Sequence, residues 1–368
     1  MKENHMFRKM SQLVLVLACL NFQPAKASEV VFINPGFNDQ GFWSSVSGTM
    51  QAAAKDLGIS LEVIASDRNR SKLLSNVKAV MSREIKPKYL IAVNEEQYGE
   101  IAVDLVKGTD TKLLFLLNDL TIEQKSKAGS ARSDNPNWIG SITPNAKFGG
   151  FEMGVSIIQA AKEKFGEPVE IFAIAGDKVT PSSIARNEGL EQAVAENPSS
   201  RIVRFLAAKW NQDTATKLTE RFIASGAGES VKAYWGGNDG ISIGMMTALK
   251  SAGLKGGEDY FIAGLNWSKP ALKLVKDGQM TLTHGGHFFA GAYSIVMIHD
   301  YENGTDFADE NVDINFPMSA IDKSNVSIYL DNLGSGDWDA IDFKKLSKVF
   351  NKSLTDYDFT LSSLLDAL

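Results

Sequence analysis

Short apolar runs alternate with amphipathic segments along the first part of the chain. The apolar runs are bounded by turn-forming residues, which predicts buried strands at 29–34, 61–65, 89–93 and 112–117. Apolar positions with helical spacing predict the helices between them, over 42–57, 71–85 and 98–107. Strands joined by crossover helices form a parallel sheet with helices on both faces. The pattern therefore predicts one doubly wound α/β lobe.

The same format begins again after Pro144-Asn145. Strands are predicted at 169–175, 201–207, 231–235 and 260–265. Helices are predicted over 147–165, 183–196, 213–225, 239–252 and 270–276. The two series share a format without a repeated sequence. Because ligands bind at the carboxyl ends of the strands in such sheets, we expect the ligand site in a cleft between two lobes.

The first 27 residues have the organisation of a secretory signal peptide. Basic residues precede the apolar run 13–20, and Ala25-Lys26-Ala27 places small residues at the two positions that a signal peptidase reads. We expect cleavage after Ala27 and export to the periplasm. The alternatives are a buried N-terminal helix and a lipoprotein box at Val16-Leu17-Ala18-Cys19, which matches only weakly because Leu17 is bulky.

Composition and charge narrow the class of protein. Hydrophobic residues make up 44% of the chain and charged residues 22%, as in ordinary globular proteins. A net charge of −6 leaves no excess of positive charge to bind a phosphate backbone, so we expect no nucleic-acid partner. Cys19 is the only cysteine, so we expect a soluble mature protein without a disulfide, which suits an oxidising compartment.

Several motifs, in their order and spacing, resemble the sugar-binding type I periplasmic binding proteins, of which the ribose-binding proteins are the nearest template. The motifs are Asn38-Asp39-Gln40-Gly41-Phe42-Trp43, the run 186–194 that begins Arg186-Asn187-Glu188-Gly189, Tyr234-Trp235-Gly236-Gly237-Asn238-Asp239, 248–253, Gly264-Leu265-Asn266 and Asp277-Gly278-Gln279-Met280. The resemblance extends over the mature chain to about Asp331. It implies two doubly wound parallel-sheet lobes joined by a three-crossing hinge.

The resemblance also implies where the domains begin and end. After a signal peptide over 1–27, the first lobe comprises 28–143 plus 286–320, and the second comprises 144–285 plus 321–368 with a C-terminal extension. Hinge crossings are expected near 142–144, 284–286 and 319–321, where short loops let the lobes rotate as rigid bodies. Phe343, Leu346, Val349 and Phe350 have helical spacing, so we expect the extension to pack as a helix across a lobe surface.

A sugar site needs aromatic faces for the C–H surfaces of the ring and fixed donors and acceptors for its hydroxyls. The resemblance assigns the aromatic positions to Phe42, Trp43 and Trp210. It places the remaining candidates at strand ends, helix starts and the hinge: Asn38, Asn94, Asn118, Asp119, Arg186, Asn238, Asn266, Trp267 and His284. Taken singly, such aromatic residues pack in cores and such Asn and Asp residues cap helices, and we expect Asp239 to be a cap.

Two departures from the family pattern change the expected ligand. Asn118-Asp119 stands where Asp-Arg is common, and Asn266 stands where Asp is common. The ligand is therefore not expected to be ribose. Trp235 and Trp267 beside the other aromatic residues favour a different sugar or a larger one.

Enzymatic alternatives have weaker support. Gly240-Ile241-Ser242-Ile243-Gly244 matches the nucleophile motif of hydrolases, with His284 downstream, but Ser242 falls in the first turn of a helix rather than directly after a strand. His284 and His287 lack a third metal ligand at recognisable spacing, and no glycine-rich phosphate loop follows a strand, so we expect neither metal nor cofactor.

The sequence therefore predicts a non-enzymatic, monomeric periplasmic protein that binds a sugar or polyol and delivers it to the permease of an ABC transporter. One alternative is a ligand-sensing partner of a membrane histidine kinase or chemoreceptor. An alternative of another class is a secreted serine hydrolase.

Overall fold

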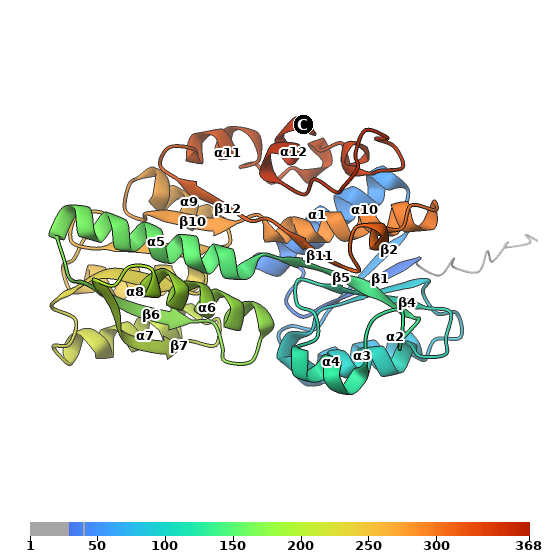
Figure 1. Cartoon of the computed structure of the whole chain (residues 1–368), viewed down its shortest axis with the longest axis horizontal. Helices are drawn as coiled ribbons and strands as arrows, with labels where there is room; N and C mark the ends of the chain where they lie inside the picture. The colour runs from blue at the N-terminus through green and yellow to red at the C-terminus, as the bar shows by residue number, and fades with distance from the viewer. Residues whose placement is uncertain (1–28, 40) are drawn as a thin grey trace, which may run out of the picture.

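The computed structural model describes residues 29–39 and 41–368, which form two lobes side by side (Figure 1). The signal peptide predicted over 1–27 and its cleavage site lie outside the described residues. Each lobe contains one sheet of six strands. The predicted class, two doubly wound parallel-sheet lobes, is confirmed.

The sheet of the first lobe has the strand order β11-β5-β4-β3-β1-β2 and is parallel throughout. Its strands are β1 (Val30–Asn34), β2 (Leu61–Ala65), β3 (Tyr89–Ala92), β4 (Lys112–Leu116), β5 (Trp138–Pro144) and β11 (Asp313–Phe316). Helices α1 (Gly41–Leu57), α2 (Arg70–Met81), α3 (Gly99–Val106), α4 (Ile122–Ala128) and α10 (Ala290–Glu302) belong to this lobe. Both faces of β1 are buried, as expected for a parallel sheet covered on both sides.

The sheet of the second lobe has the order β12-β10-β9-β8-β6-β7, and only the edge pair β10 and β12 is antiparallel. Its strands are β6 (Val169–Ala175), β7 (Ser200–Ala207), β8 (Val231–Gly236), β9 (Phe261–Leu265), β10 (Leu282–Gly285) and β12 (Ser319–Asp322). Its helices are α5 (Ala146–Phe165), α6 (Pro181–Ala195), α7 (Gln212–Ala224), α8 (Asp239–Ser251), α9 (Lys269–Lys276) and α11 (Val326–Asn332).

Side-chain caps fix where several helices begin near the strand ends. The Asn145 side chain accepts a hydrogen bond from Phe148 N at the start of α5, and Asn238 accepts one from Ile241 N at the start of α8. Thr121 and Gln124 form a reciprocal capping box at α4, an element that the apolar pattern did not predict. These caps hold the loops at the carboxyl ends of the strands, where a ligand site is expected.

Three connections join the lobes. The chain passes from β5 into α5 at Pro144-Asn145, from β10 into the 3₁₀ helix η2 (His287–Phe289) at Gly286, and from β11 to β12 at Pro317-Met318. The first two connections lie where hinge crossings were predicted, and the third lies slightly before the predicted 319–321. Because Ser319 already pairs with Gly285 in the second sheet, we propose that the first lobe's third segment ends at Met318.

The C-terminal segment, residues 326–368, lies along one side of both lobes (Figure 1). Helix α11 packs against α9 and β12 of the second lobe. The chain then reaches the first lobe, where the 3₁₀ helices η4 (Trp338–Ala340) and η5 (Phe343–Leu346) contact α1. Helix α12 (Leu361–Asp366) ends the chain.

These contacts correct two expectations about the extension. It is not one helix, because the Ser347 side chain accepts hydrogen bonds from Val349 N and Phe350 N, which replaces helical bonding after η5. Phe343 and Leu346 are buried, whereas Phe350 is exposed. Residues 338–368 lie on the first lobe, so we propose to assign them there rather than to the second lobe.

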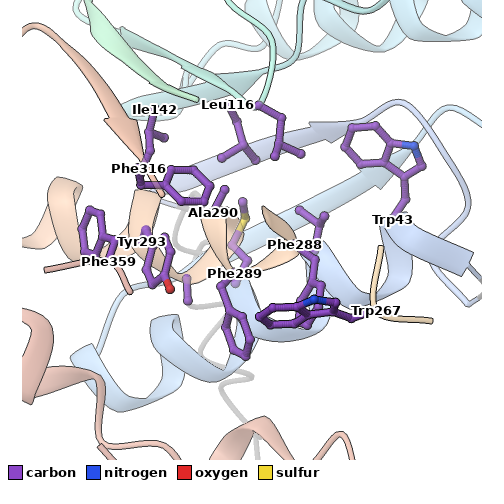
Figure 2. Packing of buried hydrophobic residues seen from close by; sticks show 14 of the residues in the cluster. Trp43, Leu116, Ile142, Trp267, Phe288, Phe289, Ala290, Tyr293, Phe316 and Phe359 are labelled. Carbon is purple, nitrogen blue, oxygen red and sulfur yellow. The ribbon is translucent and has the colours of Figure 1, made fainter. Parts of the chain in front are cut away.

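Figure 2 shows the aromatic core that unites these segments. Tyr293 of α10 stacks on Phe359 of the C-terminal segment with ring centroids 4.2 Å apart. Phe288 of the hinge meets Trp267 of the second lobe at 6.3 Å. The core thus continues from the first sheet through the hinge into the C-terminal segment. Within the described part of the chain, no helix is long and apolar enough to cross a membrane.

Candidate ligand-binding site

Two cavities lie between the lobes. The smaller one, the inner cavity, has a volume of about 60 Å³, and the larger one, the outer cavity, about 500 Å³. Predicted residues that line the inner cavity are Phe42, Trp43, Asn118, Arg186, Trp210, Asn238 and Asn266. They come from both lobes and from positions next to strand ends and helix starts. The structure therefore brings together aromatic and amide side chains at the predicted cleft.

Each lobe contributes one tryptophan to the inner cavity, and each packs closely against a glycine. A Cβ atom on Gly36, just after β1, would lie 2.2 Å from the Trp43 ring. A Cβ atom on Gly176, just after β6, would lie 2.4 Å from the Trp210 ring. Glycine at these two positions allows the rings to approach the backbone closely. The rings are thereby fixed as walls of the cavity.

Arg186 lies at the centre of the site and is almost fully buried. Its Nη1 donates a hydrogen bond to the Gly237 carbonyl oxygen at 2.8 Å, and its guanidinium carbon is 5.5 Å from the Trp210 ring centroid. Its Nε makes no hydrogen bond with any described residue. Burial lowers the pKa of Arg186 to about 10, so the side chain stays charged at neutral pH. An unpaired buried N–H beside a cavity is a donor available to a ligand.

Helix packing sets the position of Arg186. A Cβ atom on Gly150 of α5 would lie 2.1 Å from the Arg186 carbonyl oxygen, and one on Gly189 of α6 would lie 2.1 Å from the Lys147 carbonyl oxygen. The two helices cross in close contact because both positions lack side chains. Arg186 is therefore held by the backbone of α5 rather than by its own side-chain contacts alone.

His287, at the start of η2, is the hinge residue that reaches the inner cavity. Its ring stacks on Phe42 with centroids 4.5 Å apart, and its Nε2 is 3.4 Å from Arg186 Nη2. Burial, followed by the charge of Arg186, lowers the pKa of His287 well below its usual value, so the ring is neutral. Its Nδ1 is buried and makes no hydrogen bond with the described residues.

Glu95 and Arg68 add charge to the first-lobe side of the cavity. Arg68 Nη1 lies 3.9 Å from Glu95 Oε1. Burial raises the pKa of Glu95 to about 7, although the charge of Arg68 favours the ionised form. The carboxyl group therefore titrates near neutral pH, which is unusual for a glutamate and typical of functional sites.

The lobes contact each other directly across the cleft. The Asn118 side-chain oxygen, at the end of β4, accepts a hydrogen bond of 3.0 Å from Ser182 N at the start of α6. Gln97 Nε2 donates a bond of 3.3 Å to the Val179 carbonyl oxygen. These bonds join the edges of the cleft, and the structure is accordingly a closed arrangement of the lobes.

Strained backbone accompanies the cavity walls. Positive φ angles occur at Leu117 (64°), Trp210 (59°), Asn266 (149°) and Trp267 (54°), and all four residues line one of the two cavities. Residues other than glycine rarely adopt such angles, and they cluster where function or tight packing fixes the backbone.

Three predicted polar residues lie outside the lining of both cavities because other groups use their side chains. Asn94 donates to Gln124 Oε1 and the Asp119 carbonyl oxygen and accepts from Gly99 N. Asp119 pairs with Lys125 at 2.7 Å. Asn38 is exposed and accepts a hydrogen bond from Asn34. These residues fix loops near the site rather than face the inner cavity.

The other predicted residues face different neighbours. His284 points toward α5, where its Nε2 lies 2.7 Å from Glu152 Oε2. Trp267 lines the outer cavity and donates to the Ser319 carbonyl oxygen. Trp235 is fully buried and donates to the Gly150 carbonyl oxygen, so it is a core residue. Asp239 is not the expected cap, because Asn238 fills that position and Asp239 accepts from Thr283 and Ser268 instead.

The groups that suggested catalysis or metal binding do not converge. Ser242 is fully buried, and its hydroxyl donates to the Ala263 carbonyl oxygen at 2.8 Å, whereas His284 Nε2 pairs with Glu152. Among the described residues, no group of three or more His, Cys, Asp or Glu side chains is arranged to hold a metal ion.

The sequence patterns missed several residues of the inner cavity: Arg68, Glu95, Leu117, Pro144, Thr180, Ser182 and His287. Most lie in loops just after strands or before helices. For His287, the signal was present in His284-Gly285-Gly286-His287. His284 lies on strand β10 and faces helix α5. His287 follows Gly286, whose positive φ of 93° turns the chain, and it lines the inner cavity.

Two lobes that meet across a cleft lined by aromatic rings, amides and a buried arginine define a ligand-binding protein of the two-lobed type. Comparison with known proteins agrees with this class. A family model described as a periplasmic binding protein domain matches residues 140–305. The chain is 20% identical to the galactofuranose-binding protein of Escherichia coli over 74% of this chain and 82% of that protein. It is 24% identical to the ribose import binding protein of Haemophilus influenzae over 70% of this chain and 80% of that protein.

Solved structures are similar over most of the chain. A periplasmic sugar-binding protein from Pseudomonas fluorescens has a TM-score of 0.82 at 29% identity and covers 91% of this chain and 99% of its own. The binding component of the arabinose ABC transporter from Shewanella has a TM-score of 0.71 at 20% identity, covering 83% and 96%. These similarities support placing the chain in the type I periplasmic sugar-binding protein family. Its relatives are binding proteins, so the hydrolase alternative is set aside.

Proposed function

We propose that this protein closes around a small polar ligand, a sugar, in the periplasm and delivers it to the permease of an ABC transporter. The observation that carries this proposal is the buried, partly unpaired guanidinium of Arg186, held between the lobes beside Trp210 and His287. A donor in that position requires an oxygen-rich ligand. The similar proteins named for ribose, galactofuranose and arabinose support a sugar.

The chemistry of the inner cavity matches a sugar ring in two respects. Phe42, Trp43 and Trp210 offer aromatic faces to the C–H surfaces of a ring. Arg186 Nε, His287 Nδ1 and the amides of Asn238 and Asn266 offer directed hydrogen bonds to hydroxyl groups. Arg186 can hold two adjacent hydroxyls through its planar set of donors.

A thermal-shift screen of pentoses, hexoses, their furanosides and polyols tests this proposal. A ligand at 100 times its dissociation constant adds about 2.7 kcal/mol to the free energy of unfolding, which is readily visible as a higher melting temperature. Amino acids and dicarboxylates serve as the control panel. Stabilisation by the control panel alone would contradict a sugar ligand.

Delivery to a permease requires a test of its own, because a membrane sensor could use the same closed lobes. We expect uptake of the stabilising sugar, measured with labelled sugar in cells, to fall when the protein is deleted. It should return with the parent chain and not with Arg186→Ala. Unchanged uptake together with a lost transcriptional or chemotactic response would favour a sensory partner.

We also propose that the mature protein begins at Ser28, because Ala25-Lys26-Ala27 fits the pattern that a signal peptidase reads. Intact mass of the exported protein measures the processing site directly. A lipid-modified species that begins at Cys19 would replace this proposal with a membrane-anchored protein.

A further inference from the structure

The outer cavity adjoins the inner cavity. Phe42, Arg68, Asn238 and Asn266 line both of them. At about 500 Å³ the outer cavity is much the larger space, and it extends from α1 of the first lobe to α8 and α9 of the second. A ligand seated against Arg186 therefore has room to continue in this direction.

The far wall of the outer cavity comes from the C-terminal segment. Tyr329, Leu333, Gly334, Gly336 and Trp338 all line it. Lys269 Nζ donates to the Ser335 carbonyl oxygen at 3.4 Å, and Asp339 pairs with Lys55 of α1 at 2.5 Å, so this stretch is attached to both lobes. Gly336 has a φ of 76°, which suits the turn that brings Trp338 over the first lobe.

Aromatic side chains form much of this wall. Trp267 and Tyr329 lie edge to face with centroids 5.0 Å apart, and Trp338 lies 5.4 Å from Phe288. The polar residues Asn238, Asn266 and Ser268 line the same space. Burial raises the pKa of Tyr329 above its usual range, so its hydroxyl stays protonated.

Aromatic faces combined with uncharged polar groups are the features that recognise a sugar ring, and here they occur a second time. The carboxylate in the wall, Asp239, already accepts hydrogen bonds from Thr283 and Ser268, so it does not call for a cation. We infer that the outer cavity is a second carbohydrate subsite and that the ligand is a glycoside with two rings. This inference rests on the proposed function of the inner cavity.

The test compares each monosaccharide with a disaccharide that carries it at the non-reducing end, by calorimetry on the mature protein. The pairs are L-arabinose with α-1,5-arabinobiose, D-galactose with melibiose, and D-glucose with maltose. We expect one disaccharide to bind at least about tenfold more tightly than its monosaccharide, because its second ring adds stacking and hydrogen bonds in the outer cavity.

Two variants locate the second ring. Trp338→Ala removes an aromatic face, and Ser45→Trp places a bulky ring into the cavity from α1, where Ser45 lines it. Both should weaken the disaccharide by about tenfold or more and leave the monosaccharide within about twofold. Ser44→Trp is the matched control, because Ser44 is the neighbouring residue of α1 and lines neither cavity. Melting of the unliganded variants checks that each is folded.

The outcomes separate the inference from the proposed function. A disaccharide advantage that both cavity variants abolish supports the second subsite. Equal affinity for both members of every pair, or an advantage that survives in Ser45→Trp, overturns it and leaves a monosaccharide receptor. If no sugar of the panel binds the parent chain, the proposed function fails and the inference fails with it.

Discussion

At the scale of single residues, the site depends on a charge that is buried without a full set of partners. Arg186 has one strong hydrogen bond, to Gly237, a ring beside it and a free Nε. Burying a charge costs free energy that a ligand can partly return by completing its hydrogen bonds. Arg186 is therefore expected to contribute more to binding than to the stability of the unliganded protein.

Substitution of Arg186 tests whether this residue contributes more to ligand binding than to stability. We expect Arg186→Ala to weaken sugar binding by roughly 1.5 to 3 kcal/mol, and Arg186→Lys to weaken it as well, because lysine keeps the charge without the planar set of donors. Calorimetry with the sugar found by screening measures both. Arg201→Ala is the control, since Arg201 is exposed on β7. Parent-like affinity in Arg186→Ala would remove this residue from the site.

Glu95 is expected to make the free energy of unfolding of the unliganded protein depend on pH. Its pKa is about 7 in the folded state against 4.5 as the ordinary value, so the folded state binds the proton more tightly. The stability that this provides is present below pH 4.5 and is lost as the pH rises through 7. We expect Glu95→Gln to be more stable than the parent at pH 8, by roughly 1 to 3 kcal/mol, and equal to it near pH 4.

Urea unfolding between pH 4 and pH 8 measures this difference. Glu96→Gln is a matched control, because Glu96 is the adjacent residue and is more than half exposed. Asp239, whose pKa burial raises to about 6, contributes with the same sign in all three proteins and cancels from the comparison. A parent-like pH profile in Glu95→Gln would show that the pKa of Glu95 is the same in the folded and unfolded states.

Sequence patterns predicted part of the candidate site, namely the residues whose side-chain direction is set by the local structure of the chain. Phe42 and Asn238 stand in motifs at helix starts, where the position along the chain also fixes the direction of the side chain, whereas Arg186 lies in the second turn of α6, which begins at Pro181. Asn94 and Asp119 stand at similar positions, but Gln124 and Lys125 of α4 take up their polar groups. The residues that follow one strand do not reveal which side chains of another element will bond to them.

At the scale of elements, periodicity predicted most strands and helices up to residue 276 within a few residues, because the helices bury one apolar face and the strands are short apolar runs, but it did not predict β10, α10, β11 or β12. The strands 61–65 and 169–175 were predicted with their observed bounds. The C-terminal segment was not, since its apolar residues pack on α1 and α10 through short 3₁₀ turns. Tertiary contacts, rather than its own pattern, decide its conformation.

One buried carboxylate anchors that segment. Asp300 of α10 accepts hydrogen bonds from the Ser347 hydroxyl at 2.5 Å, Lys348 N at 2.6 Å and the Tyr357 hydroxyl at 3.1 Å. Asp300→Asn would turn an amide N–H₂ toward at least one of these donors. We expect a loss of roughly 2 to 4 kcal/mol in the free energy of unfolding, measured in urea. Asp309→Asn, at an exposed position, should behave like the parent.

At the scale of the whole molecule, closure requires both lobes to move against three connections and the bridge from α11 to η4. Ser182 N and Asn118 Oδ1 meet only when the lobes are together, as do Gln97 and the Val179 carbonyl oxygen. A ligand that touches groups of both lobes favours this arrangement through its higher affinity for it. The sequence indicated a hinge through family resemblance, but the bridge became visible only in the structure.

We therefore expect the radius of gyration, measured by small-angle X-ray scattering, to fall when the protein is saturated with its sugar. The lobes of the unliganded protein are free to rotate apart about the short connections at Pro144-Asn145, Gly286 and Pro317-Met318, whereas the bound ligand holds them in contact. Arg186→Ala at the same sugar concentration should keep the larger radius, because it lacks the contact that joins ligand and second lobe. If calorimetry shows saturation while the radius of the parent stays constant, the lobes are closed before the ligand arrives. The bridge would then be the element that holds them, and lengthening it with a flexible insertion between Leu333 and Trp338, which leaves the packed residues after Trp338 in place, should restore the change in radius.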